Sequence, residues 1–253
     1  MPLIKNKIMK KIRLVLWAAA LMSAFTFTSC LDENNDPIEY MSLVTIESSM
    51  GTPIMYPDEN PNQQFIFAGD VTHYGISANA TRALVRYSVP QVIDWMAPQV
   101  EVSLISGQCQ DWPVTKVTDV NYVDTCAAYT APITGFSQYG IGSIIFPSAN
   151  VVRDRYLNVG YSYRANKVGN IVMTPNRVSN DTVYFDMKLK KEGYNLSSGA
   201  MMTSFDLESA RRFISAAIPK QDSLHVTVVA LTSEDYNDKN IKKDSVTTRF
   251  RGF

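Results

Sequence analysis

Histidine and cysteine are scarce in this chain of 253 residues, which contains two histidines and three cysteines. A zinc site usually needs three or four ligands at a recognisable spacing, and neither C-x-x-C nor H-x-x-x-H occurs. His73 lies in a Gly-bounded turn candidate, and His225 is out of phase with the apolar face of its predicted strand. Neither histidine indicates a Ser–His–Asp arrangement. We therefore predict no catalytic residue, no metal and no cofactor.

An excess of positive charge is also lacking, because 24 Lys and Arg balance 24 Asp and Glu. Five of the cations lie in the first 29 residues, where there is no acid, so a chain beginning at Cys30 has a net charge of −5. An acidic chain without a basic stripe is a poor candidate for nucleic acid binding. A Gly-rich phosphate loop is absent as well.

No apolar run is long enough for a membrane-spanning helix. The longest, Leu14 to Phe27, has 14 residues, whereas a span needs about 20. Basic residues precede this run, and the small residues Thr28 and Ser29 follow it. These three zones are typical of a secretory signal peptide, which we expect over residues 1–29. A buried helix is the alternative, but the preceding cations argue against it.

Cys30 follows this segment directly in the stretch AFTFTSCLDENND. The residues from Phe27 to Cys30 resemble the lipobox of bacterial lipoproteins, although Phe27 stands where Leu or Val is usual. The resemblance implies that the Cys30 sulfur carries a diacylglycerol, with palmitate-type acyl chains, and that the new amino terminus is acylated. Several acyl chains anchor far better than one. We expect a membrane-tethered protein with no spanning helix.

Acidic residues follow the cysteine. Asp32, Glu33 and Asp36 look like the surface-export signal of some Gram-negative lipoproteins. The other interpretation is a solvated, flexible tether over residues 30–39, and the two are compatible. We predict an outer membrane lipoprotein displayed at the cell surface.

Two cysteines remain after Cys30. Cys109 and Cys126 could pair in an exported protein, since such proteins fold in oxidising surroundings. Two separately buried thiols are the alternative, and spacing alone does not decide between them.

Alternation of apolar and polar residues predicts a mainly all-β chain. In the first half, Ala83 to Val89 and Val100 to Leu104 alternate, and Leu43–Ile46 and Gln64–Ala68 are further short strand candidates. Many short strands punctuated by Pro and Gly favour a small barrel or sandwich.

The second half alternates more cleanly and favours antiparallel sheets with one solvated side. Its three predicted strands lie around Leu157–Tyr163, Val183–Leu189 and Leu224–Ala230. One short helix interrupts them. Asp206 can cap it, its apolar residues are spaced as in a helix from Leu207 to Ala217, and Pro219 ends it.

These parts resemble the NigD-like lipoproteins. The resemblance rests on the lipobox followed by acids, on TRALVRYS (81–88), and on the sandwich-half motifs RYLNVGYSY (155–163), DTVYFDMKLKKEG (181–193), SFDL (204–207) and DSLHVTVVALT (222–232). It implies an OB-like β-barrel over residues 40–121, a junction over 122–142 and an antiparallel β-sandwich over 143–253. The family offers no catalytic residues to carry over.

Two short motifs have competing interpretations. Asp235, Asn237 and Asp238 are oxygen ligands of the kind that calcium prefers, but the segment lacks the Gly and Glu of an EF-hand loop, which favours a solvated hairpin. Asp-Ser/Thr-apolar triplets begin at three places, residues 181, 222 and 244, and resemble an O-glycosylation signal of exported bacterial proteins. Turns that precede strands explain them as well.

Aromatic residues of the first half suggest one ligand face. OB barrels bind oligosaccharides on one side, and aromatic rings stack on sugars, so Tyr74, Tyr87, Trp95 and Trp112 are candidate contacts. Core packing is the alternative role of such residues.

The preferred interpretation is a non-catalytic accessory or interaction protein of the cell envelope, held in the membrane by its N-terminal lipid and binding an envelope protein or glycan. A glycan-binding module that uses the barrel face is the alternative. A hydrolase with an unrecognised site is the third.

Overall fold

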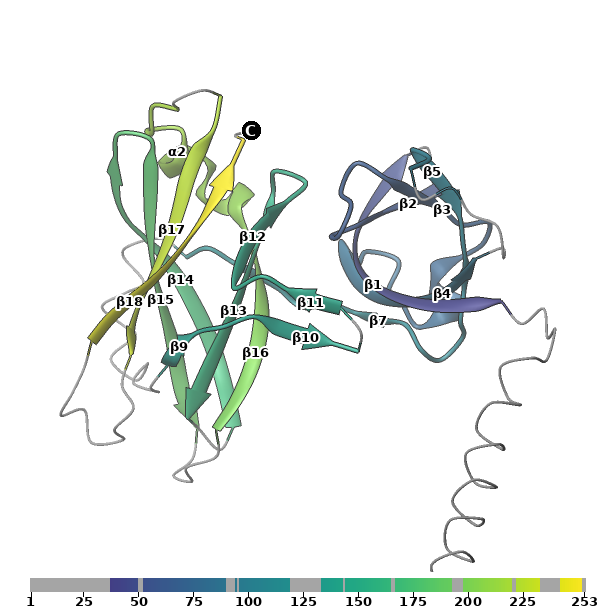
Figure 1. Ribbon diagram of the computed structural model, residues 1–253, viewed down its shortest axis with the longest axis horizontal. Helices are drawn as coiled ribbons and strands as arrows, with labels where there is room; N and C mark the ends of the chain where they lie inside the picture. Colours follow the sequence, from purple (N-terminus) through teal and green to yellow (C-terminus); the bar gives the residue numbers. More distant parts are fainter. Residues whose placement is uncertain are drawn as a thin grey trace, which may run out of the picture. The chain divides into compact units, whose positions relative to one another are not determined.

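The computed structural model describes residues 37–49, 52–89, 94, 96–118, 133–142, 144–164, 167–192, 198–219, 222–232 and 242–251. Residues 39–253 form one compact unit. The fold is all-β, as predicted, and consists of two nearly closed, barrel-like sheets with one short helix among the described residues (Figure 1). None of the described helices is long and apolar enough to cross a bilayer.

The smaller sheet has seven strands in the order β5-β3-β2-β1-β4-β6, with β7 also paired to β4. Their bounds are β1 Ile38–Ser49, β2 Thr52–Pro57, β3 Gln64–Ile66, β4 Arg82–Val89, β5 Gln99–Glu101, β6 Ser103–Leu104 and β7 Gln110–Asp111. The 3-10 helix η2, Val71–Tyr74, lies between β3 and β4.

This sheet curls into a barrel because its two ends adjoin in sequence. Strands β5 and β6 end the hydrogen-bonded order, yet only Val102 separates them. The Val102 N–H donates to the Ile66 carbonyl at 3.0 Å, and the Ile105 N–H donates to the Arg86 carbonyl at 2.9 Å. The chain therefore passes from one end of the sheet to the other and nearly closes it (Figure 1).

The barrel core confirms the predicted apolar face of β4. Ala83, Val85, Tyr87 and Val89 are all at most 4% exposed and pack with Phe65 and other barrel residues. The predicted strand from Val100 to Leu104 is divided: β5 pairs with β3 in parallel, and β6 pairs with β4 antiparallel.

The larger sheet has nine strands in the order β14-β15-β17-β9-β13-β16-β8, with β12 paired to β13 and β18 to β17. Their bounds are β8 Val114–Lys116, β9 Ile133–Phe136, β12 Ala149–Val152, β13 Tyr156–Arg164, β14 Lys167–Ser179, β15 Thr182–Glu192, β16 Ser198–Asp206, β17 Leu224–Thr232 and β18 Lys242–Phe250. A separate hairpin consists of β10 Tyr139–Ile141 and β11 Ile144–Phe146.

The ends of this sheet also approach one another, since the Thr118 N–H just after β8 donates to the Met173 carbonyl of β14 at 2.8 Å. Its interior holds the predicted apolar residues of β13, β15 and β17, including Leu157, Phe185 and Val228, each fully buried. Five described strand pairs of this sheet are antiparallel, and three are parallel: β15 with β17, β16 with β8, and β17 with β9. The antiparallel expectation was wrong for these three pairs. Between β15 and β17, for example, β16 and the helix intervene in sequence and return the chain in the same direction.

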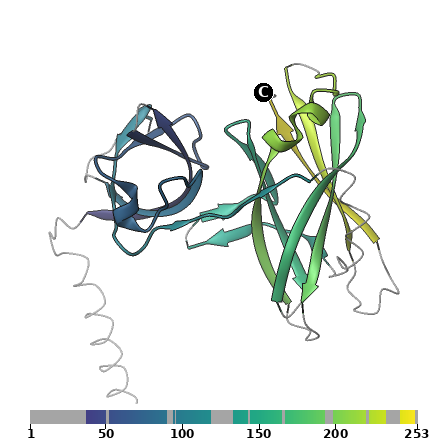
Figure 2. The same cartoon turned by 180° about the vertical axis from the view of Figure 1, so that it is seen from behind.

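The predicted helix is confirmed as a 3-10 turn, η4 Leu207–Ala210, continued by α2 Arg211–Ile214. The Asp206 carboxylate accepts the Glu208 N–H at 3.0 Å, which satisfies a free donor of the first turn. Leu207, Ala210, Ile214 and Ala217 are buried in the core of the larger sheet. The helix lies at one end of that sheet (Figure 2).

The chain passes from the smaller sheet to the larger one between Asp111 and Val114. This point precedes the predicted junction over residues 122–142, and β9 and β10 lie inside that range. Strand β8 has three residues, too few to show an alternation pattern. The domain boundaries themselves stay a prediction.

A third apolar cluster links the strands of both sheets. Leu43 of β1, Phe146 of β11 and Met202 of β16 are its buried members, and Trp112 packs against them. Trp112 donates its backbone N–H to the Arg82 carbonyl at 2.9 Å and its indole N–H to Ser204 Oγ at 3.0 Å.

Candidate functional site

Several predicted site residues lie outside the described part of the chain. They are the lipid-attachment residue Cys30, the export-signal acids Asp32, Glu33 and Asp36, the aromatic Trp95, the thiol Cys126, and the calcium-ligand candidates Asp235, Asn237 and Asp238. The structure does not test these predictions.

Of the four aromatic residues predicted to form a ligand face, three are described, and one of them is buried. Tyr87 is 3% exposed inside the barrel, where its ring centroid lies 4.8 Å from that of Phe65 and 5.9 Å from that of Tyr40. Burial raises the pKa of Tyr87 to about 12. Tyr74 packs edge-on against Phe67, and Trp112 is directed toward Ser204. Core packing uses the Tyr87 ring, whereas Tyr74 and Trp112 are half-buried, so a ligand face that includes them stays a prediction.

Cys109 is a buried, free thiol. Its Sγ lies 3.6 Å from the carbonyl oxygens of Arg86 and Ile105, which share its single S–H hydrogen. Burial raises the pKa of this thiol, which lowers its thiolate fraction and its reactivity. A disulfide with Cys126 stays a prediction, since Cys126 is not described.

The two histidines are separate. His73 is exposed in η2, and His225 in β17 is the register partner of Thr182 in β15 and of Arg249 in β18. No group of three or more His, Cys, Asp or Glu side chains suited to a metal occurs within the described ranges.

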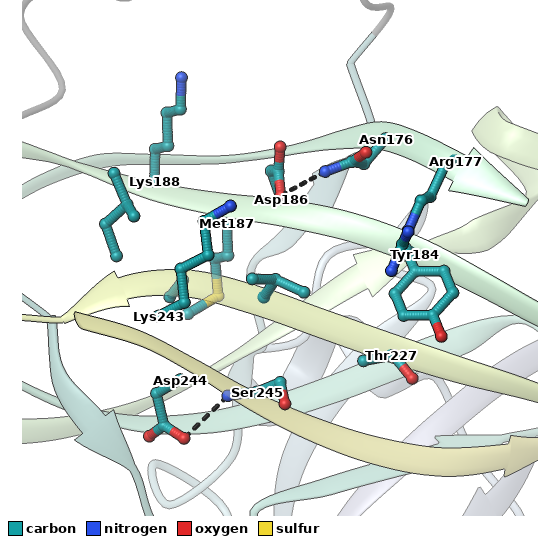
Figure 3. Close-up of a pocket in the computed structure, with 13 residues that line it drawn as sticks. Asn176, Arg177, Tyr184, Asp186, Met187, Lys188, Thr227, Lys243, Asp244 and Ser245 are labelled. Atoms are coloured by element: carbon teal, nitrogen blue, oxygen red, sulfur yellow. Dashed lines mark hydrogen bonds between the residues drawn. The ribbon is translucent and has the colours of Figure 1, made fainter.

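A groove of about 630 Å³ lies on the outer face of strands β14, β15, β17 and β18 (Figure 3). Most of its lining residues are outward side chains of these strands, because successive side chains of a strand point to opposite faces, but the core residues Met187 and Ala230 also line it. One wall carries Arg177, whose guanidinium lies 4.3 Å from the Tyr184 ring centroid. Beside it, Asn176 donates its amide N–H to Asp186 Oδ1 at 2.9 Å. These contacts hold the wall in place.

The other end of the groove is amphipathic. Leu231 is 54% exposed in β17 and is the register partner of Lys243 in β18. Lys188 of β15 lines the groove from the other side of β17 (Figure 3). Across the groove floor, Val229 is the register partner of Ser245. This end of the groove therefore combines an exposed leucine with two lysines.

The most buried polar groups of the described chain were not predicted. Arg82 of β4 is 0% exposed and contacts Asp58, Thr45 and Asn158. Asn158 of β13 in turn donates to Asp58 Oδ2 at 2.8 Å and accepts from Ser204 Oγ at 2.7 Å. The network is structural, because it is closed to solvent on both sheets.

Comparisons with known proteins identify the fold. No family model and no curated protein matches the sequence. The chain is similar in structure to a Bacteroides fragilis NCTC 9343 protein described as a "Putative lipoprotein (BF3042)", with a TM-score of 0.60, 11% identity, and coverage of 85% of this chain and 99% of that one. It is also similar to a "Putative TOXIN related protein" from Parabacteroides distasonis ATCC 8503, with a TM-score of 0.51, 14% identity, and coverage of 84% and 93%. At these identities the likeness shows that the fold is shared.

Proposed function

We propose that this protein is a lipoprotein of the bacterial outer membrane, acylated on Cys30 and displayed at the cell surface, where it serves as a non-catalytic binding or accessory protein. The observation that carries the proposal is the order of basic residues, short apolar run, small residues and cysteine over residues 1–30. The shared fold with a protein described as a lipoprotein supports it. We also propose that the protein is related to the NigD-like lipoproteins.

The position of the first strand fits a lipid tether. Strand β1 begins at Ile38, eight residues after Cys30. Eight extended residues span at most about 29 Å, which is enough to hold a folded body just outside the headgroups. The acids Asp32, Glu33 and Asp36 lie within this tether.

The anchor is tested by replacing its thiol. Cells that express the wild-type chain or Cys30→Ser are labelled with radioactive palmitate and fractionated. We expect label and membrane partition for the wild type and loss of both for the variant, because serine cannot carry the thioether. Equal membrane partition of the two chains would overturn the anchor.

Surface display is tested on intact cells with an added protease. The wild-type protein is expected to be cleaved, whereas a variant with Asp32, Glu33 and Asp36 replaced by Ala is expected to be protected while still membrane-bound. Protection of the wild type would place the protein on the periplasmic side instead.

The groove of Figure 3 is the surface that we assign to the binding role. Its exposed leucine and flanking lysines combine apolar contact with positive charge on a chain that is acidic after processing. The non-catalytic part of the proposal is tested with a panel of chromogenic ester, peptide and glycoside substrates. Turnover that a single substitution abolishes would contradict it.

A further inference from the structure

A second cavity, of about 570 Å³, lies at the end of the larger sheet away from the groove of Figure 3. The β12–β13 turn, the residues just before β17 and the end of β18 all line it. Its charged lining residues are Arg153, Asp154, Asp222, Arg249 and Arg251. Both signs of charge are therefore present in one concave site.

The backbone is strained where it forms this cavity. Arg153 and Asp154 have φ values of 51° and 47°, and Asp222 has φ 58°. Among the described residues, four non-glycine residues have positive φ, and these are three of them. The Arg155 N–H donates to the Val152 carbonyl at 3.1 Å, which closes a tight turn whose central positions favour Asn-Gly. Aspartate tolerates positive φ in turns, so Arg153 is the residue whose conformation is unusual here.

The role of Arg153 is visible in its contacts. Its guanidinium donates to both carboxylate oxygens of Glu47, at 2.9 and 3.1 Å, and lies 3.8 Å from the Tyr56 ring centroid. Asp154 and Asp222 are exposed, and the described part of the chain offers them no hydrogen bond or ion pair. Contacts with Glu47 and Tyr56 therefore explain the position of Arg153, whereas no contact within the described residues explains why Asp154 and Asp222 face the cavity.

Arg249 and Arg251 face the same cavity. Arg249 lies near the end of β18 and Arg251 directly follows the strand, and both line the cavity on either side of the buried Phe250. Both are exposed, and neither has an ion-pair partner within the described residues. Paired guanidiniums suit a carboxylate, because each presents a planar fork of donors.

The charges that line the cavity indicate the class of ligand that it can bind. Two guanidiniums and two carboxylates without partners match a ligand that carries both signs. A sugar acid fits less well, because the nearby Tyr56 ring is already covered by Arg153 and offers no free face for stacking. We propose that this cavity binds a small zwitterion, namely a short peptide with free termini, whose carboxylate contacts Arg249 and Arg251 and whose ammonium contacts Asp154 and Asp222. This binding does not depend on the lipid anchor or on the groove.

The test uses tri-alanine as the probe and the lipidated full-length protein in detergent. Binding is measured by calorimetry for tri-alanine, for its N-acetyl form and for its C-terminal amide. We expect each cap to weaken binding about tenfold or more, because each removes one of the two charges. A probe that binds equally well with either cap would overturn the proposal.

Substitutions of the lining residues test whether tri-alanine binds in this cavity. Arg249→Ala with Arg251→Ala is expected to remove binding of tri-alanine and to leave thermal unfolding close to wild type, since both side chains are exposed. Asp154→Asn keeps a residue that tolerates positive φ and is expected to lower the affinity about tenfold. Lys242→Ala, an exposed position at the other end of β18 and outside both cavities, is the matched control and is expected to bind as wild type does.

Two results would reject the proposal. One is the absence of any heat of binding for tri-alanine at millimolar concentrations with a folded protein. The other is binding of galacturonate in place of tri-alanine, which would assign the cavity to an acidic saccharide.

Discussion

Arg82 and Asp58 form a buried ion pair, with Arg82 Nη2 2.6 Å from Asp58 Oδ2 and Nη1 2.9 Å from Oδ1. The two side chains are 0% and 1% exposed. Arg82 begins β4 of the smaller sheet, and Asn158 of β13 in the larger sheet contacts both members of the pair. The pair therefore couples strands of both sheets.

Removing one member of this pair is expected to destabilise the protein strongly. Asp58→Ala leaves the Arg82 guanidinium buried without its counter-charge, and we expect the free energy of unfolding to fall by about 3–5 kcal/mol in urea denaturation. Glu39→Ala is the control. It breaks an Arg86–Glu39 pair whose side chains are 40% and 45% exposed, and we expect a loss below about 1 kcal/mol. Equal losses would contradict the structural role of the network.

Gly160 in β13 has no room for a side chain. A Cβ at this position would lie 2.3 Å from the Ser137 carbonyl oxygen, a backbone atom that itself belongs to a paired segment. We expect Gly160→Ala to lower the melting temperature and to cost about 1–3 kcal/mol. Gly140→Ala, whose Cβ would meet its nearest atom at 3.7 Å, is expected to change stability by less than about 0.5 kcal/mol. Unchanged stability of the Gly160 variant would show that β9 and β13 do not approach as described.

Because two tyrosines are buried, we expect the free energy of unfolding to fall at high pH. Burial raises the pKa of Tyr161 and of Tyr87 to about 12. Because these folded-state pKa values lie above the unfolded value of 10.0, the stabilising contribution is complete below pH 10 and is lost as the pH rises toward 12. We expect each tyrosine to account for about 2 kcal/mol of that loss.

The measurement is urea denaturation at pH 10 and at pH 12, with phenolate absorbance as a second signal. Tyr161→Phe removes the titrating hydroxyl and should show a smaller decrease between the two pH values than the wild type. A decrease of the same size in both proteins would mean that Tyr161 does not govern the alkaline transition.

Cys109 is expected to resist alkylation in the folded protein. Its thiol is buried, and its raised pKa keeps the thiolate fraction low near neutral pH. Iodoacetamide treatment followed by peptide mass spectrometry should label Cys109 at least about tenfold more slowly in native protein than in urea. Rapid labelling of native protein would show that the β6–β7 region opens.

The strands were predictable where one face is buried and the other is solvated. Val183, Phe185, Met187 and Leu189 are each at most 1% exposed, as their alternation indicates. The Asp206 cap was predictable for a similar reason, since a cap depends on residues within one turn. The spacing of neighbouring residues is therefore enough to predict the buried face of a strand and the start of the helix.

The burial of Tyr87 was also predictable from local spacing. Tyr87 occupies the apolar phase of β4, and its alternation with Arg86 and Ser88 is a signal for burial. Arg82 was not predictable in this way, because arginine is mostly exposed in proteins, yet this side chain is 0% exposed. Partners for Arg82 come from residues 24 and 76 positions away, so no local pattern reveals them.

The amino-acid sequence by itself predicts an export signal and an acylation motif at Cys30, and it determines the all-β class and the inward face of the long strands, because each depends on neighbours within a few residues. The tertiary structure decides which polar side chains are buried together, which strands run parallel, and where charged residues such as Asp154 and Arg251 meet in one cavity. Those features depend on chain segments brought together only when the sheets close.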